Sequence, residues 1–401
     1  MSYQIKRRDQ FLATTAILGS MSLFATDARA ACTESFAGSG VWDCTGANIS
    51  TQSPTSATGG ALDVSTSSAI STITPAGNAL NLTNAIGDTD ISFLDVFTST
   101  ITGNDNGIYS INNGTGNTSL ITDANITGST LDGVFVDNTS TGSAIAITTN
   151  GTVLGDDRGI RANNDGSGTT SVATTGAVTG TTQEGIQVSN TGAATNITVN
   201  TGAGAVSGAN MGIDVSNSGT GGTTSVTTSG AVTGTSDHAI NVLQDTGTSG
   251  VTINTGAGAL MGGRKGILVD NDGNGATSVT TAGNVTGTTE DGVFIDNAAT
   301  TTGATVNANA GTITGNTNGV YIDHKGTGAA VVTGSANITG STLDGVFVDN
   351  TSTGSAIAIT TNGTVLGDDR GIRANNDGSG TTSVATTGAV TGTTQEGIQV
   401  S

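Results

Sequence analysis

The chain has 401 residues, of which 63 are Gly and few are aromatic (one Trp, three Tyr and eight Phe), and its formal net charge is −20. So few bulky side chains exclude a large conventional globular core, and the acidic balance excludes nucleic acid and anionic membrane surfaces as partners. The mean hydropathy is nevertheless +0.00, and Val and Ile recur at regular intervals. This pattern favours an ordered repeat over a disordered coil.

Residues 1–30 have the features of a secretory signal peptide. Three basic residues at positions 6–8 precede a mostly apolar run over residues 11–25, and an Ala-Arg-Ala cleavage sequence ends at Ala30. The run is shorter than the roughly 20 apolar residues that span a bilayer. We expect cleavage after Ala30 and export of the mature chain to the cell surface, the outer membrane or the medium.

Residues 31–76 are expected to form an N-terminal cap. The two cysteines of the chain, Cys32 and Cys44, lie 12 positions apart on either side of Trp42. In an exported chain this arrangement favours a local disulfide that closes the cap, and two free thiols are the alternative.

Residues 77–401 are a run of repeats. The septet DGVFVDN occurs at residues 132–138 and again at residues 344–350, and related septets recur throughout at a spacing of roughly 26 residues. With Ala79 one step before the first Gly, the aligned positions define 13 repeats: Ala79, Gly107, Gly133, Gly159, Gly185, Gly212, Ala239, Gly266, Gly292, Gly319, Gly345, Gly371 and Gly397.

A longer unit overlies these repeats, because residues 124–189 are identical to residues 336–401. The two copies stand eight short repeats apart. Additional repeats lengthen a rod without altering its cross-section, so a duplication of this kind suits a spacer.

Each repeat contains the pattern of three short strands. Counting from the Gly, the residues one and three positions later are almost always Ile, Val or Leu, as in Val134 and Val136, and the residue between them varies. A turn, a second strand such as TNITVNT, another Gly and a third strand such as GAVTGT follow. Three strands in about 26 residues are typical of one coil of a parallel β-helix, whose neighbouring coils pair at about 4.8 Å. The sequence therefore predicts an all-β parallel β-helix of about 13 coils.

The position five residues after the Gly is almost always an amide. An inward-turned amide at one corner of every coil can bond to the coils above and below and satisfy turn backbone groups. The alternative is that Asn is simply a common turn residue. We favour a stacked ladder, in which His324 substitutes for an amide. Its members are Asn84, Asn112, Asn138, Asn164, Asn190, Asn217, Gln244, Asn271, Asn297, His324, Asn350 and Asn376.

The chain resembles the secreted passenger domains of bacterial autotransporters, the type V secretion proteins. The resemblance lies in the leader ending ARAAC, the early cysteine pair in CTESFAGSGVWDC, and coils such as GIQVSNTGAATNITV and GIDVSNSGTGGTTSV, and it covers residues 31–401. It implies a right-handed parallel β-helix of the pectin-lyase-like kind that acts as a rigid stalk or adhesin. It also implies a C-terminal membrane β-barrel as the link to the membrane. Because the chain stops at Ser401 inside a repeat, we expect it to be the N-terminal portion of a longer protein.

A β-helix enzyme that degrades polysaccharides is the alternative function. The string GDDRGIRANND at residues 155–165 places Asp156 and Asp157 beside Arg158 and Arg161, a set that could supply carboxylates and cations. The string recurs at residues 367–377, which favours decoration of a repeated surface over catalysis. The two histidines, His238 and His324, lie in different coils without a nucleophile partner, so zinc sites and nucleophile triads are unsupported. We therefore expect no enzyme activity.

Apolar and aromatic side chains gather at the outward position two residues after the Gly. We predict an exposed apolar stripe there that binds a glycan or protein of a host surface or matrix, since planar rings at strand spacing suit sugar rings or an added β-strand. The alternative is that the rings stack on one another to stabilise the sheet. The candidate partner-binding residues are Leu268, Phe294, Tyr321, Phe347, Tyr109 and Phe135.

Four aspartates, Asp270, Asp296, Asp323 and Asp349, fall four residues after the Gly in consecutive repeats. Stacked in register, these carboxylates would repel one another at about 4.8 Å. Ca²⁺, the one cofactor considered, could offset the repulsion because it accepts carboxylates from separate strands. The alternative is that Lys325, neighbouring amides and counterions suffice.

Overall fold

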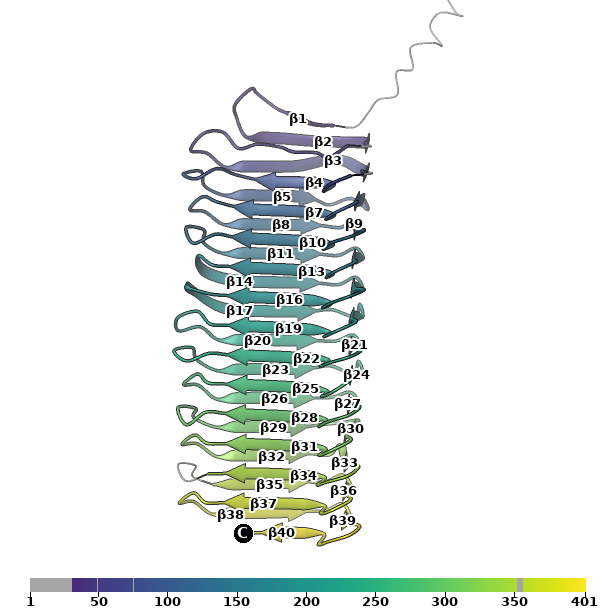
Figure 1. Cartoon of the computed structure of the whole chain (residues 1–401), viewed down its shortest axis with the longest axis vertical. Coiled ribbons are helices and arrows are strands. Elements are labelled where there is room, and N and C mark those ends of the chain that lie inside the picture. The colour runs from purple at the N-terminus through teal and green to yellow at the C-terminus, as the bar shows by residue number, and fades with distance from the viewer. Residues whose placement is uncertain (1–30, 49, 75, 352–355) are drawn as a thin grey trace, which may run out of the picture.

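The computed structural model describes residues 31–401 except for residues 49, 75 and 352–355. In this part of the chain there are forty strands and no helix, wound as a right-handed parallel β-helix whose coils stack into a rod (Figure 1). The predicted fold class, with about 13 coils, is confirmed. Residues 1–30, which hold the predicted signal peptide, lie outside the described residues.

Each coil contributes one strand to each of three parallel stacks, called sheets 1, 2 and 3; sheets 2 and 3 are joined at the N-terminal end by β3 (Leu62–Ile73), which pairs with strands of both. Sheet 1 contains β4 (Leu80–Thr83), β7 (Ile108–Asn112), β10 (Val134–Asn138), β13 (Ile160–Asn164), β16 (Ile186–Asn190), β19 (Ile213–Asn217), β22 (Ile240–Gln244), β25 (Ile267–Asn271), β28 (Val293–Asn297), β31 (Val320–His324), β34 (Val346–Asn350), β37 (Ile372–Asn376) and β40 (Ile398–Val400). Sheet 2 contains β5 (Ile91–Asp95), β8 (Thr118–Thr122), β11 (Ile145–Thr149), β14 (Ser167–Thr174), β17 (Ala193–Thr201), β20 (Thr224–Thr228), β23 (Val251–Thr255), β26 (Thr277–Thr281), β29 (Ala304–Ala308), β32 (Ala330–Gly334), β35 (Ile357–Thr361) and β38 (Thr382–Thr386). Sheet 3 contains β6 (Thr100–Gly103), β9 (Asn125–Gly128), β12 (Val153–Gly155), β15 (Val178–Gly180), β18 (Val206–Gly208), β21 (Val232–Gly234), β24 (Leu260–Gly262), β27 (Val285–Gly287), β30 (Thr312–Gly315), β33 (Asn337–Gly340), β36 (Val365–Gly367) and β39 (Val390–Gly392).

The coils stack in register along sheet 1. Val134 pairs with Ile108 on one side and with Ile160 on the other, so the same position of successive repeats lies on one line. The second copy of the duplicated block repeats this pairing, with Val346 opposite Ile372. The duplication therefore extends the stack without a change of register.

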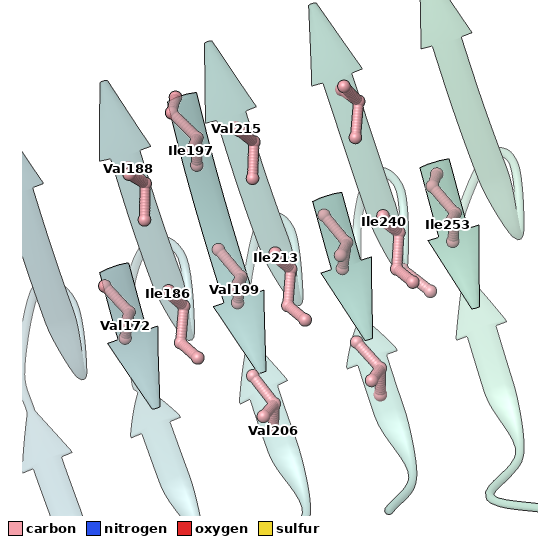
Figure 2. Packing of buried hydrophobic residues seen from close by; sticks show 14 of the residues in the cluster. Val172, Ile186, Val188, Ile197, Val199, Val206, Ile213, Val215, Ile240 and Ile253 are labelled. Carbon is pink, nitrogen blue, oxygen red and sulfur yellow. The ribbon is translucent and has the colours of Figure 1, made fainter. Parts of the chain in front are cut away.

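The core consists of columns of β-branched side chains. Ile186 and Val188 from β16 and Ile197 and Val199 from β17 are fully buried between sheets 1 and 2 (Figure 2). β-Branched residues fit a pleated surface, and burial of each contributes roughly 1.5–3 kcal/mol. Inward positions alternate with half-exposed ones along sheet 1, as the period of two predicts.

Glycine ends each strand of sheet 3 because the chain turns tightly there into sheet 1. A Cβ atom on Gly155 would lie 1.7 Å from the carbonyl oxygen of Arg158, and one on Gly234 would lie 2.0 Å from that of His238. A side chain at this position would therefore displace the turn backbone.

The amide ladder is buried at the corner after sheet 1. Asn217 is fully buried, and its Nδ2 donates to the Thr195 carbonyl of the preceding coil, 3.1 Å away, and to Thr224 Oγ1, 3.3 Å away. Thr224 Oγ1 in turn donates to Gln244 Oε1 of the next coil, at 2.5 Å. The ladder is confirmed, although some steps, such as this one and that from Asn164 through Thr170 to Asn190, pass through a Thr hydroxyl that was not predicted.

Direct contacts between ladder members occur at a few steps. Asn84 Nδ2 donates to Asn112 Oδ1 and Asn350 Nδ2 to Asn376 Oδ1, both at 2.8 Å. His324 is fully buried in the ladder, with Nε2 2.9 Å from the Gly328 carbonyl oxygen. His324 therefore takes the place of an amide in the ladder.

An antiparallel strand covers the N-terminal end of the rod. β1 (Cys32–Glu34) pairs antiparallel with β2 (Val41–Asn48), and a disulfide joins Cys32 to Cys44. β2 and β3 (Leu62–Ile73) are themselves parallel, and β3 pairs with both β5 and β6. Stacking thus already begins within residues 31–76.

Asn217→Ala is expected to lower the free energy of unfolding by about 1–3 kcal/mol, because it leaves buried groups of two coils without partners. The measurement is equilibrium denaturation followed by circular dichroism. Thr227→Ala, at a half-buried outward position of β20, is the matched control and should change stability far less. Equal losses in both variants would contradict a structural role for the ladder.

Candidate binding surface

The outward residues of sheet 1 form two columns along the rod. The first column holds the residues two positions after the Gly and the second holds those four positions after it. Register pairing defines the first column as Asn81, Tyr109, Phe135, Arg161, Gln187, Asp214, Asn241, Leu268, Phe294, Tyr321, Phe347, Arg373 and Gln399.

The aromatic side chains of this column form two stacked groups. Tyr109 and Phe135 stack with ring centroids 5.2 Å apart. In the second group the Phe294 and Tyr321 centroids are 5.0 Å apart, and those of Tyr321 and Phe347 are 4.7 Å apart with the rings 6° from parallel. Such pairs contribute about 0.5–1.5 kcal/mol beyond burial, so both groups stabilise the sheet.

Cations cover the outer ring faces of these groups. The Arg161 guanidinium lies 5.1 Å from the Phe135 centroid, and the Arg373 guanidinium lies 4.5 Å from that of Phe347. Lys265 Nζ lies 5.2 Å from the Phe294 centroid. Apart from the outer face of Tyr109, the ring faces are therefore occupied by other rings and by cations.

The side chains of the predicted apolar stripe lie at outward positions and are partly covered by their neighbours. Leu268, Phe294, Tyr321 and Phe347 are half-buried, as are Tyr109 and Phe135. Because the rings stack along the rod axis, the faces inside each group are covered by neighbouring rings and cannot also stack on a sugar ring. Contact with a partner through this column stays a prediction.

The second column contains the four predicted aspartates, which stack in register. Lys325 forms ion pairs with Asp296 and, at 2.9 Å, with Asp323. Burial opposes the charge of Lys325, but hydrogen bonds from its ammonium to these carboxylates outweigh that effect and raise its pKa. A side-chain cation thus neutralises the middle of the column, and the calcium site at Asp270, Asp296, Asp323 and Asp349 stays a prediction.

The two ends of the acidic column differ from its middle. Burial raises the pKa of Asp270, and repulsion from Asp272 and Asp296 adds to it. Burial likewise raises the pKa of Asp349, with a contribution from Asp323. Both carboxylates therefore carry their charge at a cost in the folded state.

Between the two aromatic groups the first column is polar. Asp214 accepts hydrogen bonds from Gln187 Nε2 at 3.3 Å and from Asn241 Nδ2 at 2.8 Å. Burial raises the pKa of Asp214, and the two amide hydrogen bonds oppose that rise. This amide–carboxylate–amide group was not predicted, although its members share one register in the sequence.

A charged column beside sheet 1 was also missed. Arg158 lies between two buried acids: its Nε donates to Glu184 Oε2 at 2.8 Å, and its backbone N–H donates to Asp132 Oδ1 at 3.1 Å. In the second copy Arg370 lies between Asp344 and Glu396, but Glu396 is exposed and the Arg370 Nε–Glu396 Oε2 distance is 3.5 Å. The signal in the sequence was the alternation of acid and base one position before the Gly of successive repeats.

The acidic string that suggested an enzyme takes part in the same packing. Asp156 Oδ1 accepts a hydrogen bond from Thr181 Oγ1 at 2.9 Å, and Asp157 Oδ1 accepts one from Thr182 Oγ1 at 3.1 Å. Asp368 and Asp369 make the same contacts with Thr393 and Thr394 in the second copy. These carboxylates therefore connect neighbouring coils.

Among the residues that the structure describes, no group of three or more His, Cys, Asp or Glu side chains is placed to hold a metal ion. No helix in residues 31–401, with the gaps given above, is long and apolar enough to cross a membrane. Comparisons with protein-family models, with curated proteins and with solved structures found no match to this chain.

The raised pKa of Asp270 predicts a pH-dependent effect of removing its charge. The Asp270 carboxyl group binds a proton more readily in the folded state than in the unfolded state. Its negative charge therefore destabilises the fold at pH values above the folded-state pKa. Well below the ordinary carboxyl pKa of about 3.9 the group is protonated in both states and has no such effect. Asp270→Asn should therefore raise the thermal midpoint at pH 8.

The same variant should leave the midpoint unchanged at pH 3, where the carboxyl is protonated in both states. The measurement is thermal unfolding at the two pH values, with Asp63→Asn, whose residue lies on β3 near the cap, as the control. A midpoint that falls at pH 8 would contradict the assignment.

Proposed function

We propose that the chain is the exported passenger of an autotransporter and acts as a rigid stalk and adhesin on or near the bacterial surface. The observation that carries the proposal is the uninterrupted in-register stack, which continues through the duplicated block. A parallel stack of this kind has the same cross-section at every coil, as a spacer requires.

The stack supports a rod rather than a flexible tether. Thirteen coils at about 4.8 Å extend roughly 60 Å, and main-chain hydrogen bonds join every coil to the next. Buried ladders at the corners add side-chain bonds between coils. Bending the rod would break many of these bonds together, so we expect a stiff object.

The outward columns of sheet 1 support an adhesive role for one face. They hold the aromatic groups and basic residues such as Arg161 and Arg373, whereas outward positions of sheet 3 are mostly Thr, as in Thr179 and Thr233. Chemical variety on one face of a repetitive rod suits recognition of a host-surface or matrix glycan or protein.

The same fold is compatible with a polysaccharide-degrading enzyme. The charged string that suggested catalysis makes packing contacts in both of its copies, with Arg158 held between Asp132 and Glu184. These contacts favour the stalk and adhesin over the enzyme.

Inserting one more copy of residues 124–335 after residue 335 tests the stalk. Because residues 124–189 equal residues 336–401, both junctions of this insertion reproduce native sequence. We expect eight added coils to lengthen the rod by about 38 Å with an unchanged cross-section. Small-angle X-ray scattering measures both quantities, with the unmodified chain as control. An unchanged maximum dimension of the particle, or a kinked shape, would contradict the proposed stalk.

Export predicts a mature chain that begins at Ala31. Expression of the full chain in a Gram-negative host, followed by N-terminal sequencing of the periplasmic product, measures the cleavage site. Ala30→Arg should block processing because signal peptidase requires a small residue before the cut. A cytoplasmic chain that keeps residue 1 would contradict export.

A further inference from the structure

Two arginines differ from the other cations of the rod. Arg158, Arg264, Lys265, Lys325 and Arg370 all form ion pairs. Within the described residues, Arg161 and Arg373 form neither an ion pair within 4 Å nor a hydrogen bond from the side chain. Unpaired arginines are unexpected in a chain whose net charge is −20, where carboxylates are plentiful.

Aromatic rings hold both guanidinium groups in place. Arg161 lies over Phe135, which stacks on Tyr109, and Arg373 lies over Phe347, which stacks on Tyr321. The first column therefore reads Tyr, Phe, Arg, Gln twice, ending at Gln187 in one copy and at Gln399 in the other.

The free ends of the two guanidinium groups face solvent. The Nε atoms are buried without a partner, whereas the Nη atoms are not among the buried unpaired atoms of the described residues. Both arginines are half-buried, and their Nη atoms, unlike Nε, keep some surface in contact with solvent. Two parallel N–H groups held in this way match the two oxygens of a carboxylate.

Neutral hydrogen-bonding side chains lie beside each arginine in the two outward columns of sheet 1, in addition to carboxylates beyond ion-pair distance. Asn163 follows Arg161 on the same face of β13, and Gln187 and Ser189 are the register partners of Arg161 and Asn163 on β16. Asn375, Gln399 and Ser401 occupy the equivalent places in the second copy. Amides and hydroxyls of this kind hydrogen-bond to sugar hydroxyl groups.

We infer that Arg161 and Arg373 are two equivalent binding sites for the carboxylate of an acidic sugar at the end of a host glycan. The inference rests on the proposed adhesive function and names its ligand class. The Nη pair would bind the carboxylate, and the Asn, Gln and Ser side chains would bind hydroxyl groups of the same sugar.

The charge of the rod favours a ligand with a single carboxylate over a polyanion. Asp137 attracts Arg161 from beyond ion-pair distance, and Asp349 lies in the same relation to Arg373. A polymer with a charge on every residue would meet these carboxylates and the rest of an acidic surface. A glycan that carries one terminal carboxylate can bind one guanidinium without placing further negative charges against the acidic surface.

The two sites lie on the same face of the rod, eight coils or about 38 Å apart. A surface densely coated with such glycans can occupy both sites at once. The second contact then forms at a raised effective concentration, so weak single sites yield firm attachment.

The test uses the purified full chain and 3′-sialyllactose as the probe, with isothermal titration calorimetry as the measurement. We expect two sites per chain, one site in Arg161→Gln or Arg373→Gln, and at least a tenfold loss of affinity in the double variant. Arg264→Gln removes an exposed, ion-paired arginine, and as the charge control it should keep both sites. Arg161→Lys with Arg373→Lys keeps the charges but loses the planar fork, so it should bind more weakly than the unmodified chain.

Several results would overturn the inference. They are unchanged binding in a double variant that retains its circular dichroism and thermal midpoint, equal binding of neutral lactose, and tighter binding of 3′-sulfated lactose or of a capped peptide with one Glu. Rod length is measured independently of these titrations. If the inserted block lengthens the rod but sialyllactose does not bind, the ligand assignment fails and the stalk remains.

Discussion

Parallel main-chain pairing between coils is the constraint on which the rest of this structure depends. Because every coil pairs in register with the next, each side chain has the equivalent residue of the next repeat about 4.8 Å away. A residue type therefore suits a position only if it makes favourable contacts with the same residue type, or with a complementary one, at the equivalent position of the next coil. Val and Ile columns in the core, such as Val134 against Ile160, satisfy this condition by dispersion and burial.

Polar and charged positions need a more specific arrangement. Amides suit a column because they both donate and accept, and the buried Thr hydroxyls relay the bond from Asn217 to Gln244. Charges are harder to place, since like charges repel at this spacing. The rod alternates them, as in Asp132, Arg158 and Glu184, or places a lysine across two carboxylates, as Lys325 does.

The sequence was sufficient for the fold because its signals are periodic. A Gly that recurs once in every repeat defines the coil, and the period of two after each Gly separates inward from outward residues, as for Val134 and Phe135. Side-chain directions along the rod axis were not accessible in the same way. Whether the Phe347 ring shows its face or its edge depends on Tyr321 and Arg373, which lie in the preceding and following coils. Sequence alone therefore left ring stacking and partner binding open as alternatives, and the Thr relay was missed because it joins different strands.

The exact repetition of residues 124–189 at residues 336–401 has a consequence for how the chain reaches this state. A growing stack presents an edge strand that makes the same contacts with either copy, since the two sequences are identical, and only the entropy of closing the intervening loop disfavours the later one. A later copy that docks first would leave eight coils looped out, a kinetic trap that no local contact disfavours. The cap counters this hazard, because the disulfide-joined β1 and β2 occur once in the described chain and offer a unique starting template. Growth from that end would add the coils in chain order, so that the first copy docks before the second.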